Sequence, residues 1–342
     1  MLRKILILLG LCLAAPAAYA ASGTVVLGTA PNAPTGPGPG NIFVVNSRAM
    51  TAQSGSFAKA GTPEGNSFFA GYDPATQTIF IPSPAGRLVM LSSKDLAPTG
   101  SFAVIRGARL ARVLPHRNVL IVLSAQAVAA YKLDTHRAVF TLAIGGNALA
   151  VDHREARLYV GGNMDRTITA IDLSSGRIVT SYPVAHSGDL VLANDRLFSA
   201  DIKTGVMSVV DLRTGHISLL KTPEVDPHVS YQAIANANAG FMQLAKSTRG
   251  RFVYAAGFSG HILKFSTKTP RYLGEIPVSA GNGANKLSGL AVVDHGTEAV
   301  VTIENRDATA LVRLTTGKIL HIFQGVASNR WIEMQPIPSP RA

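Results

Sequence analysis

The chain has almost no sulfur chemistry available to it. Its 342 residues include a single cysteine, Cys12, which lies in an apolar run at the N-terminus. One cysteine cannot form an internal disulfide, and c-type haem attachment needs a cysteine pair. Structural zinc sites built on cysteine sets are excluded for the same reason. The stability of the protein must therefore come from a packed core, and a chain of this length can bury a large one.

Charged and aromatic side chains are also scarce. Charged residues make up 15% of the chain, whereas globular proteins usually contain about 25%. Aromatic residues make up 6%, and the single tryptophan, Trp331, excludes a cofactor made from two tryptophan side chains. Glycine and proline, by contrast, are frequent, with 32 and 19 residues. Low charge with many turn-forming residues is typical of an all-β protein.

Long apolar runs are missing after the N-terminal segment. Residues 1–20 combine a basic start, an apolar run from Ile5 to Ala15 and small residues at Ala18 and Ala20. This pattern predicts a secretory signal peptide, and the apolar run is shorter than a membrane-spanning helix. We therefore expect cleavage after Ala20 and a periplasmic or secreted protein without a membrane span.

The segment LYVGGNMDRTITAIDLSSGRIVTSYPV (158–184) alternates β-branched runs with polar turns. It lacks a helical period and reads as strands at 158–160, 167–173 and 177–184. A phosphate-binding loop would open into a helix, whereas this Gly-rich turn opens into a strand. The segment therefore predicts a unit of β-structure rather than a nucleotide site.

This unit recurs along the chain. VMSVVDLRTGHISLL (206–220) and ALVRLTTGKILHIF (310–323) are close copies, and looser copies begin near residues 87, 127 and 261. One equivalent position is occupied in turn by Leu91, Tyr131, Ile171, Val210, Phe265 and Val312. The spacings between these residues are 40, 40, 39, 55 and 47. A period near 40 residues, made of short strands and turns, is typical of the blades of a β-propeller.

The sequence LYVGGNMDRTITAIDLSSGRIV (158–179) resembles the YVTN-type β-propeller repeat. That repeat has Tyr-Val-x-Asn, a short turn, a strand, and then Asp-x-x-Thr-Gly. IFVVN (42–46) resembles another start of the repeat, and by its period the resemblance covers about residues 69–326. The resemblance implies a binding or scaffold module of the cell envelope.

We expect residues 21–342 to form one β-propeller domain of seven four-stranded blades, with six or eight blades as alternatives. Six repeats lie between residues 69 and 326. Strands around 24–60 and 327–338 would pair in the last blade, which closes the ring and covers the exposed strand edges. The two longer spacings predict an insertion of about 15 residues within 222–247 and a smaller one at 279–289. Residues 231–245 are compatible with a short helix.

In propellers, the connections between blades and the turns between the second and third strands of each blade gather on one face. Both insertions belong to these connections, and extra loops on one face often form a binding site. We call the face that carries these connections the insertion face. The candidate binding residues expected there are Arg106, Asn147, Arg166, His186, Lys203, His228, Tyr231, Lys286 and Arg306. Basic residues with an aromatic side chain suit an anionic polymer or single-stranded nucleic acid.

An alternative interpretation uses carboxylate and amide groups of the same face. Asn163, Asp201 and Glu304 would hold a divalent ion over the central channel, as in lactonase-type propellers, where the ion polarises a carbonyl and activates water. The same residues are equally suited to pairing within their own turns. Most histidines do not add to this site, because they occupy predicted turns at the other face or at the rim: His116, His153, His295, His136 and His216.

The sequence contains no P-loop, no Gly-x-Ser-x-Gly elbow and no His-Glu-x-x-His motif. We therefore expect a non-catalytic monomer without a cofactor that binds an unknown protein or an anionic ligand of the cell envelope. Nucleic acid is a weaker candidate ligand. A metal-dependent lactonase-type hydrolase is the alternative, and an accessory of a periplasmic redox enzyme is a third.

The signal peptide gives the first testable prediction. Expression of the full chain in a bacterium with a periplasm is expected to yield a protein that begins at Ala21, because the small residues at 18 and 20 suit the signal peptidase. Mass measurement of the intact protein from the periplasmic fraction checks this. Retention of residues 1–20 would contradict it.

Overall fold

The computed structural model describes residues 24–28, 41–56, 70–73, 75–162, 166–201, 204–224, 240–281, 285–326 and 335–337. These residues form an all-β protein in which regular helix is limited to three-residue 3₁₀ turns. The predicted signal peptide (1–20) lies outside the described residues and stays a prediction. No helix in the described part of the chain is long and apolar enough to cross a membrane.

Six four-stranded sheets are each built from four strands that are consecutive in the chain and pair antiparallel with their neighbours. The first two comprise β4 (Gly71–Asp73), β5 (Thr78–Ser83), β6 (Arg87–Ser92) and β7 (Pro98–Ala103), then β8 (Ala108–Leu114), β9 (Val119–Ser124), β10 (Val128–Lys132) and β11 (Ala138–Leu142). The next two comprise β12 (Ala148–Val151), β13 (Arg157–Gly161), β14 (Thr167–Asp172) and β15 (Arg177–Pro183), then β16 (Asp189–Ala193), β17 (Arg196–Ala200), β18 (Met207–Asp211) and β19 (Ile217–Leu220). The last two comprise β20 (Phe241–Lys246), β21 (Phe252–Gly257), β22 (His261–Ser266) and β23 (Arg271–Pro277), then β24 (Leu287–Val293), β25 (Glu298–Ile303), β26 (Ala308–Arg313) and β27 (Ile319–Gln324).

A further four-stranded sheet joins the two ends of the chain. It consists of β1 (Thr24–Gly28), β2 (Asn41–Asn46), β3 (Thr51–Ser56) and the C-terminal β28 (Gln335–Ile337). β28 pairs antiparallel with β1, with Thr24 opposite Ile337, so the strands from the two chain ends pair as the sequence predicts. The structure thus has six blades of consecutive strands, the alternative to the seven expected, and this additional sheet formed by the two chain ends.

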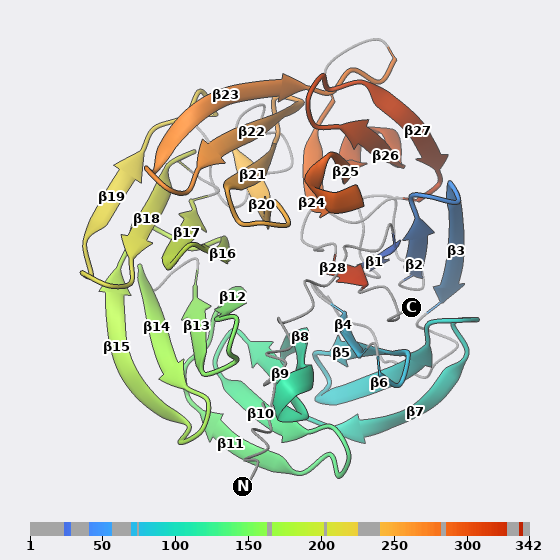
Figure 1. The fold of residues 1–342 in the computed structure, drawn as a ribbon. Helices are drawn as coiled ribbons and strands as arrows, with labels where there is room; N and C mark the ends of the chain where they lie inside the picture. Colours follow the sequence, from blue (N-terminus) through green and yellow to red (C-terminus); the bar gives the residue numbers. More distant parts are fainter. Residues whose placement is uncertain are drawn as a thin grey trace, which may run out of the picture.

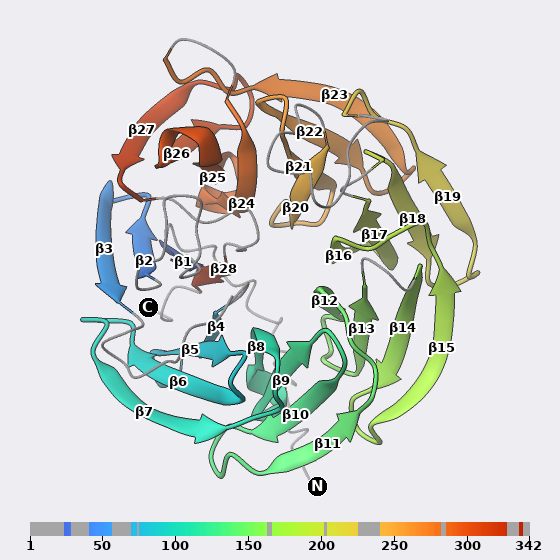
Figure 2. The same cartoon turned by 180° about the vertical axis from the view of Figure 1, so that it is seen from behind.

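The sheets are arranged in a ring like the blades of a propeller (Figure 1, and from behind in Figure 2). The first strand of each consecutive set lies innermost and the last lies at the rim. β28 contacts both β24 and β4, so the sheet made from the two chain ends lies between the last and the first of the other six. This placement closes the ring.

The core lies between neighbouring blades and uses both faces of the middle strands. All six residues of β9 are buried. Leu120 and Val122 pack with residues of β5 and β6, whereas Ile121 and Leu123 pack with residues of β13. Successive side chains of a strand point to opposite faces, so a strand between two blades must be apolar at every position. This explains why the repeats read as continuous apolar runs without alternation. The rim strand β15, with only one covered face, is mostly exposed.

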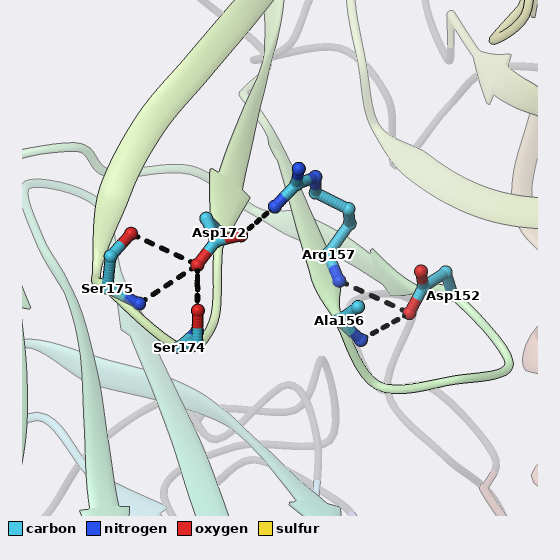
Figure 3. A network of polar contacts seen from close by, with 6 residues as sticks. All are labelled: Asp152, Ala156, Arg157, Asp172, Ser174 and Ser175. Carbon is cyan, nitrogen blue, oxygen red and sulfur yellow. Dashed lines mark hydrogen bonds and ion pairs between the residues drawn. The ribbon is translucent and has the colours of Figure 1, made fainter.

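The Asp-x-x-Ser-Gly part of the repeat is a turn held by its own side chains (Figure 3). Asp172 Oδ1 accepts hydrogen bonds from the amides of Ser174 (3.0 Å) and Ser175 (2.9 Å). Hydrogen bonds from Ser174 and Ser175 hold the pKa of Asp172 well below its ordinary range. Gly176 follows with φ of 64°, a left-handed conformation that glycine adopts without strain. The motif therefore serves the turn between the third and fourth strands of the blade.

Arg157 connects this turn with the first hairpin turn of the same blade. Its guanidinium pairs with Asp172 Oδ2, and its amide donates to Asp152 Oδ1 (3.2 Å; Figure 3). The next blade repeats the ion pair, with Arg196 Nη2 3.1 Å from Asp211 Oδ2. The close similarity of these two repeats in sequence thus reflects a common way of holding the turns.

The connectivity separates two ends of the ring. Each inner strand begins at a connection between blades and ends at a first hairpin turn, so these turns gather at the end opposite the insertion face. We call this end the hairpin face; its described turns are 75–77, 115–118, 152–156, 194–195, 247–251 and 294–297. His116, His153 and His295 all belong to these turns, as predicted.

The helix considered for residues 231–245 is wrong over its described part. Residues 241–246 form the strand β20, because the blade needs an inner strand that pairs with β21 before the turn at 247–251. Residues 225–239 lie outside the described residues. The insertion therefore belongs to the connection between Leu220 and Phe241.

The closing sheet gives a prediction on stability. Deletion of residues 335–342 removes β28 and leaves the edge of β1 without its partner. Each lost backbone hydrogen bond costs about 1 kcal/mol, so the melting temperature should fall by roughly 3–8 °C. Deletion of residues 338–342 keeps β28 and is the matched control. Equal thermal denaturation midpoints for the two truncated proteins would contradict the closure.

Candidate functional site

The insertion face contains eight of the residues proposed from the sequence. The described ones are Arg106, Asn147, Arg166, His186, Asp201, Lys286, Glu304 and Arg306. The other four, Asn163, Lys203, His228 and Tyr231, lie outside the described residues. The described residues fall into two kinds: cations that point to solvent, and polar groups that hold the loops.

Arg106 and Arg166 are exposed on turns of this face. Arg106 follows β7 and lies over Gly86, where a Cβ atom would come within 3.2 Å of Arg106 Cγ. Arg166 precedes β14, and its carbonyl accepts a hydrogen bond from Val184 (2.8 Å). Both side chains are exposed and therefore accessible to a ligand.

Asn147 and His186 hold connections between blades. Asn147 Oδ1 accepts a hydrogen bond from Arg109 Nη1 (3.2 Å), and burial lowers the pKa of Arg109. The His186 carbonyl accepts a hydrogen bond from the buried Ser199 hydroxyl (3.2 Å). His186 itself is half-buried. These contacts fix the inner strands β12 and β16 where each begins.

The structure brings Lys286 and Arg306 to the base of the smaller insertion. The Lys286 amide donates to Asn305 Oδ1 (2.9 Å), and the Glu304 amide donates to the Lys286 carbonyl (2.8 Å). Lys286 Nζ lies 4.9 Å from the centre of the Phe258 ring. Two loops from two blades are thereby joined at one point.

Asn285 completes this junction. It is buried, and its Oδ1 accepts a hydrogen bond from Arg306 Nε while its Nδ2 donates to the Val278 carbonyl. The amide thus joins both ends of the 278–285 connection to the turn between β25 and β26. Arg306 contributes to the base of the insertion as well as to the charge of the face.

A buried carboxylate holds the ends of the larger insertion, and the sequence did not point to it. Glu224 is 1% exposed, and its Oε2 accepts hydrogen bonds from the amides of Gly240 (2.9 Å) and Ser259 (3.3 Å). The Ser259 hydroxyl donates to the other oxygen. Burial raises the pKa of Glu224. Because Glu224 and Gly240 flank residues 225–239, one side chain ties the two ends of that segment together.

The network continues outward from Ser259. Its Oγ lies 2.8 Å from His261 Nδ1, and His261 Nε2 lies 3.7 Å from Glu275 Oε2. Serine, histidine and glutamate are the components of a nucleophilic triad. Here, however, the histidine–glutamate distance exceeds a hydrogen bond, and the serine hydroxyl is already held by Glu224. The geometry therefore supports an anchor for the loop rather than an activated nucleophile.

The carboxylates proposed as metal ligands lie in separate turns. Asp201 is fully buried, and its carboxylate accepts hydrogen bonds from the Thr204 amide (3.4 Å) and hydroxyl (2.5 Å). Glu304 begins the 3₁₀ turn Glu304–Arg306, two blades further along the ring. Among the described residues, no group of three or more His, Cys, Asp or Glu side chains is arranged to hold a metal ion. Asn163 is not described, so the proposed trio as such stays a hypothesis.

Two cations of the inner strands were also missed. Lys246, at the end of β20, donates from Nζ to the Leu192 carbonyl of β16 (3.1 Å). Desolvation and the charge of Arg112, on β8, lower the pKa of Lys246. The signal was present, because each cation lies in a largely apolar strand, but only the fold brings these strands together.

Comparison with known proteins supports the fold alone. No protein-family model matches the chain, and a search of curated proteins finds no match. Among solved structures, Kuenenia stuttgartiensis hydrazine synthase is similar, with a TM-score of 0.58 over 73% of this chain and 77% of that chain. The sequences are 13% identical over this alignment. At that identity the similarity shows a shared β-propeller arrangement of strands.

The Glu224 anchor predicts a pH dependence. The pKa of Glu224 is above its ordinary value of 4.5 in the folded protein. Protonated Glu224 therefore contributes fully to the stability of the folded protein below pH 4.5. This contribution is lost as the pH rises through the pKa of Glu224 in the folded state. Glu224→Gln keeps an acceptor and does not ionise. The melting temperature of this variant minus that of the native protein should therefore increase from pH 4 to pH 7.

Glu224→Ala is the matched comparison. It leaves the amides of Gly240 and Ser259 without an acceptor and should cost about 1–3 kcal/mol at every pH. Parallel pH profiles for the native protein and Glu224→Gln would contradict a raised pKa at this position.

Proposed function

We propose that this chain is a non-catalytic binding or scaffold module of the cell envelope, which binds its partner through the insertion face. The partner is an anionic ligand or a protein with an anionic surface. The predicted signal peptide supports location in the periplasm or outside the cell, and the likeness of residues 158–179 to the YVTN-type repeat supports an envelope role.

The observation that carries this proposal is the way both insertions are anchored at one face. Glu224 ties the ends of the larger insertion, and Asn285 with Arg306 ties the smaller one. Buried polar groups at these positions hold loops on a rigid ring, which lowers the cost of ordering them when a partner binds. Reaction chemistry would instead need convergent groups that remain available to a substrate.

The charge of the face indicates the chemistry of the partner. Arg106 and Arg166 are exposed, and Lys286 and Arg306 add two further cations. The whole chain carries a net charge of +12 at pH 7. Cations on accessible loops attract anionic partners and make binding depend on salt.

The alternative is a metal-dependent hydrolase of the lactonase type, with Asn163, Asp201 and Glu304 around a divalent ion. The buried position of Asp201 and its hydrogen bonds to Thr204 favour a role within its own turn. A metal that raises the melting temperature of the protein and is removed by EDTA would favour this alternative.

Heparin, an anionic glycan, is a suitable probe for the proposed site. Residues 21–342 are expected to bind it with an affinity that falls as salt rises, and Arg106→Gln/Arg166→Gln should weaken binding about tenfold. Arg177→Gln, an exposed arginine of the rim strand β15, is the control and should leave binding within about twofold. Isothermal titration calorimetry gives the dissociation constants for heparin.

Deletion of residues 226–239 tests the insertion itself. Glu224, Gly240 and the ring remain, so the deleted protein should still unfold cooperatively while it binds heparin more weakly. Unchanged binding in both the deletion and the double arginine variant would contradict a binding role for this face.

A further inference from the structure

A cleft of about 610 Å³ opens at the hairpin face, between the blades β20–β23 and β24–β27. Its walls come from the turn 247–251 of one blade and the turn 294–297 of the other. The two turns touch where Gly296 meets Thr248: a Cβ atom on Gly296 would lie 3.4 Å from Thr248 Oγ1. Gly296 has φ of 92°, a conformation that other residues rarely adopt, so the backbone of this turn favours glycine.

The cleft is strongly basic. Arg249, Arg251 and Lys264 line it together with His295, and no aspartate or glutamate does. Within the described part of the chain, none of these three cations forms an ion pair with a carboxylate. Three positive charges gathered in one concave site, without compensating carboxylates, attract a ligand with several negative charges.

The acidic residues next to the cleft are directed to other partners. Asp294 Oδ2 accepts a hydrogen bond from Thr297 Oγ1 (2.8 Å). Glu298 Oε1 lies 4.0 Å from Arg313 Nη2. Neither carboxylate lines the cleft, so its positive charge stays available to a ligand.

The floor of the cleft is apolar and its edge carries hydroxyl groups. Phe252 and the buried Tyr254 lie on β21, with ring centres 6.3 Å apart. Lys264 Nζ lies 4.1 Å from the centre of the Phe252 ring, which holds the ammonium group beside the aromatic surface. Thr248 and Thr315 add hydroxyl groups at the rim. An inorganic ion would contact only part of such a site.

We propose that this cleft binds a small organic molecule with two or more phosphate or sulfate groups, of the size of a phosphorylated or sulfated sugar. Small-molecule sites usually enclose about 300–1,000 Å³, and this cleft falls in that range. Its arginines suit oxyanions, because the planar guanidinium donates two parallel hydrogen bonds to such groups. The organic part of the ligand lies over Phe252 and Tyr254.

This site is independent of the function proposed for the insertion face. The cleft lies at the opposite end of the ring, where inner strands end rather than begin. It shares no residue with the loops anchored by Glu224 and Asn285. A ligand here and a partner on the insertion face can therefore be bound by one molecule at the same time.

Isothermal titration of residues 21–342 with fructose 1,6-bisphosphate tests the proposal, and a disulfated disaccharide distinguishes sulfate from phosphate as the preferred group. Binding of either compound is expected, with a dissociation constant at least tenfold lower than that of inorganic phosphate. Uncharged fructose should not bind. Absence of binding by both polyanions, or equally tight binding of inorganic phosphate, would overturn the proposal.

Substitutions locate the binding in the cleft. Arg249→Gln/Arg251→Gln changes two exposed side chains, and Lys264→Gln changes a half-buried one; each variant should weaken binding about tenfold. Arg271→Gln, an exposed arginine on the rim strand of the same blade, is the control and should bind as the native protein does. Native affinity in both cleft variants would place the ligand elsewhere and overturn the assignment. The insertion-face variant Arg106→Gln/Arg166→Gln should bind fructose 1,6-bisphosphate as the native protein does, which separates the two sites.

Discussion

The packing of each sheet between two neighbouring sheets is the interaction on which the rest of the structure depends. Every middle strand buries apolar side chains on both faces, as Leu120 and Ile121 do on opposite sides of β9. A row of such sheets would leave an apolar face exposed at each end, which a closed ring avoids. The pairing of β1 with β28 closes it, and the insertion and hairpin faces are the two ends of this ring.

The two faces of the ring differ in how much the lengths of their loops can vary. Connections between blades cross from the rim to the inside, so they accept extra residues without disturbing the sheets. Both insertions occur there, and Glu224 and Asn285 fix where each begins and ends. First hairpin turns are short and lie directly over the seams between blades. At one seam, Arg249 and Lys264 from one blade face His295 from the next, and a basic cleft results.

Much of the fold could be predicted from the sequence, because the period and the turn chemistry are local. Asp172, Ser174 and Gly176 act within five residues, and the apolar runs report burial on both faces. The inner strand β20 was not recognised, since FMQLAK follows a long insertion that shifts it away from the position expected from the repeat period. The anchor of Glu224 and the cleft could not be predicted, because Ser259 and Lys264 reach their partners only through strand pairing and blade packing.

Hydrogen–deuterium exchange on residues 21–342 tests the closed ring most directly. If the sheet from both chain ends is packed like the others, the amides of β1 and β2 exchange as slowly as those of β9 and β25, in one cooperative unit. Exchange of β1 and β2 that is orders of magnitude faster than that of β9 and β25 would show an open ring. It would contradict the account of the protein as one body with two distinct faces.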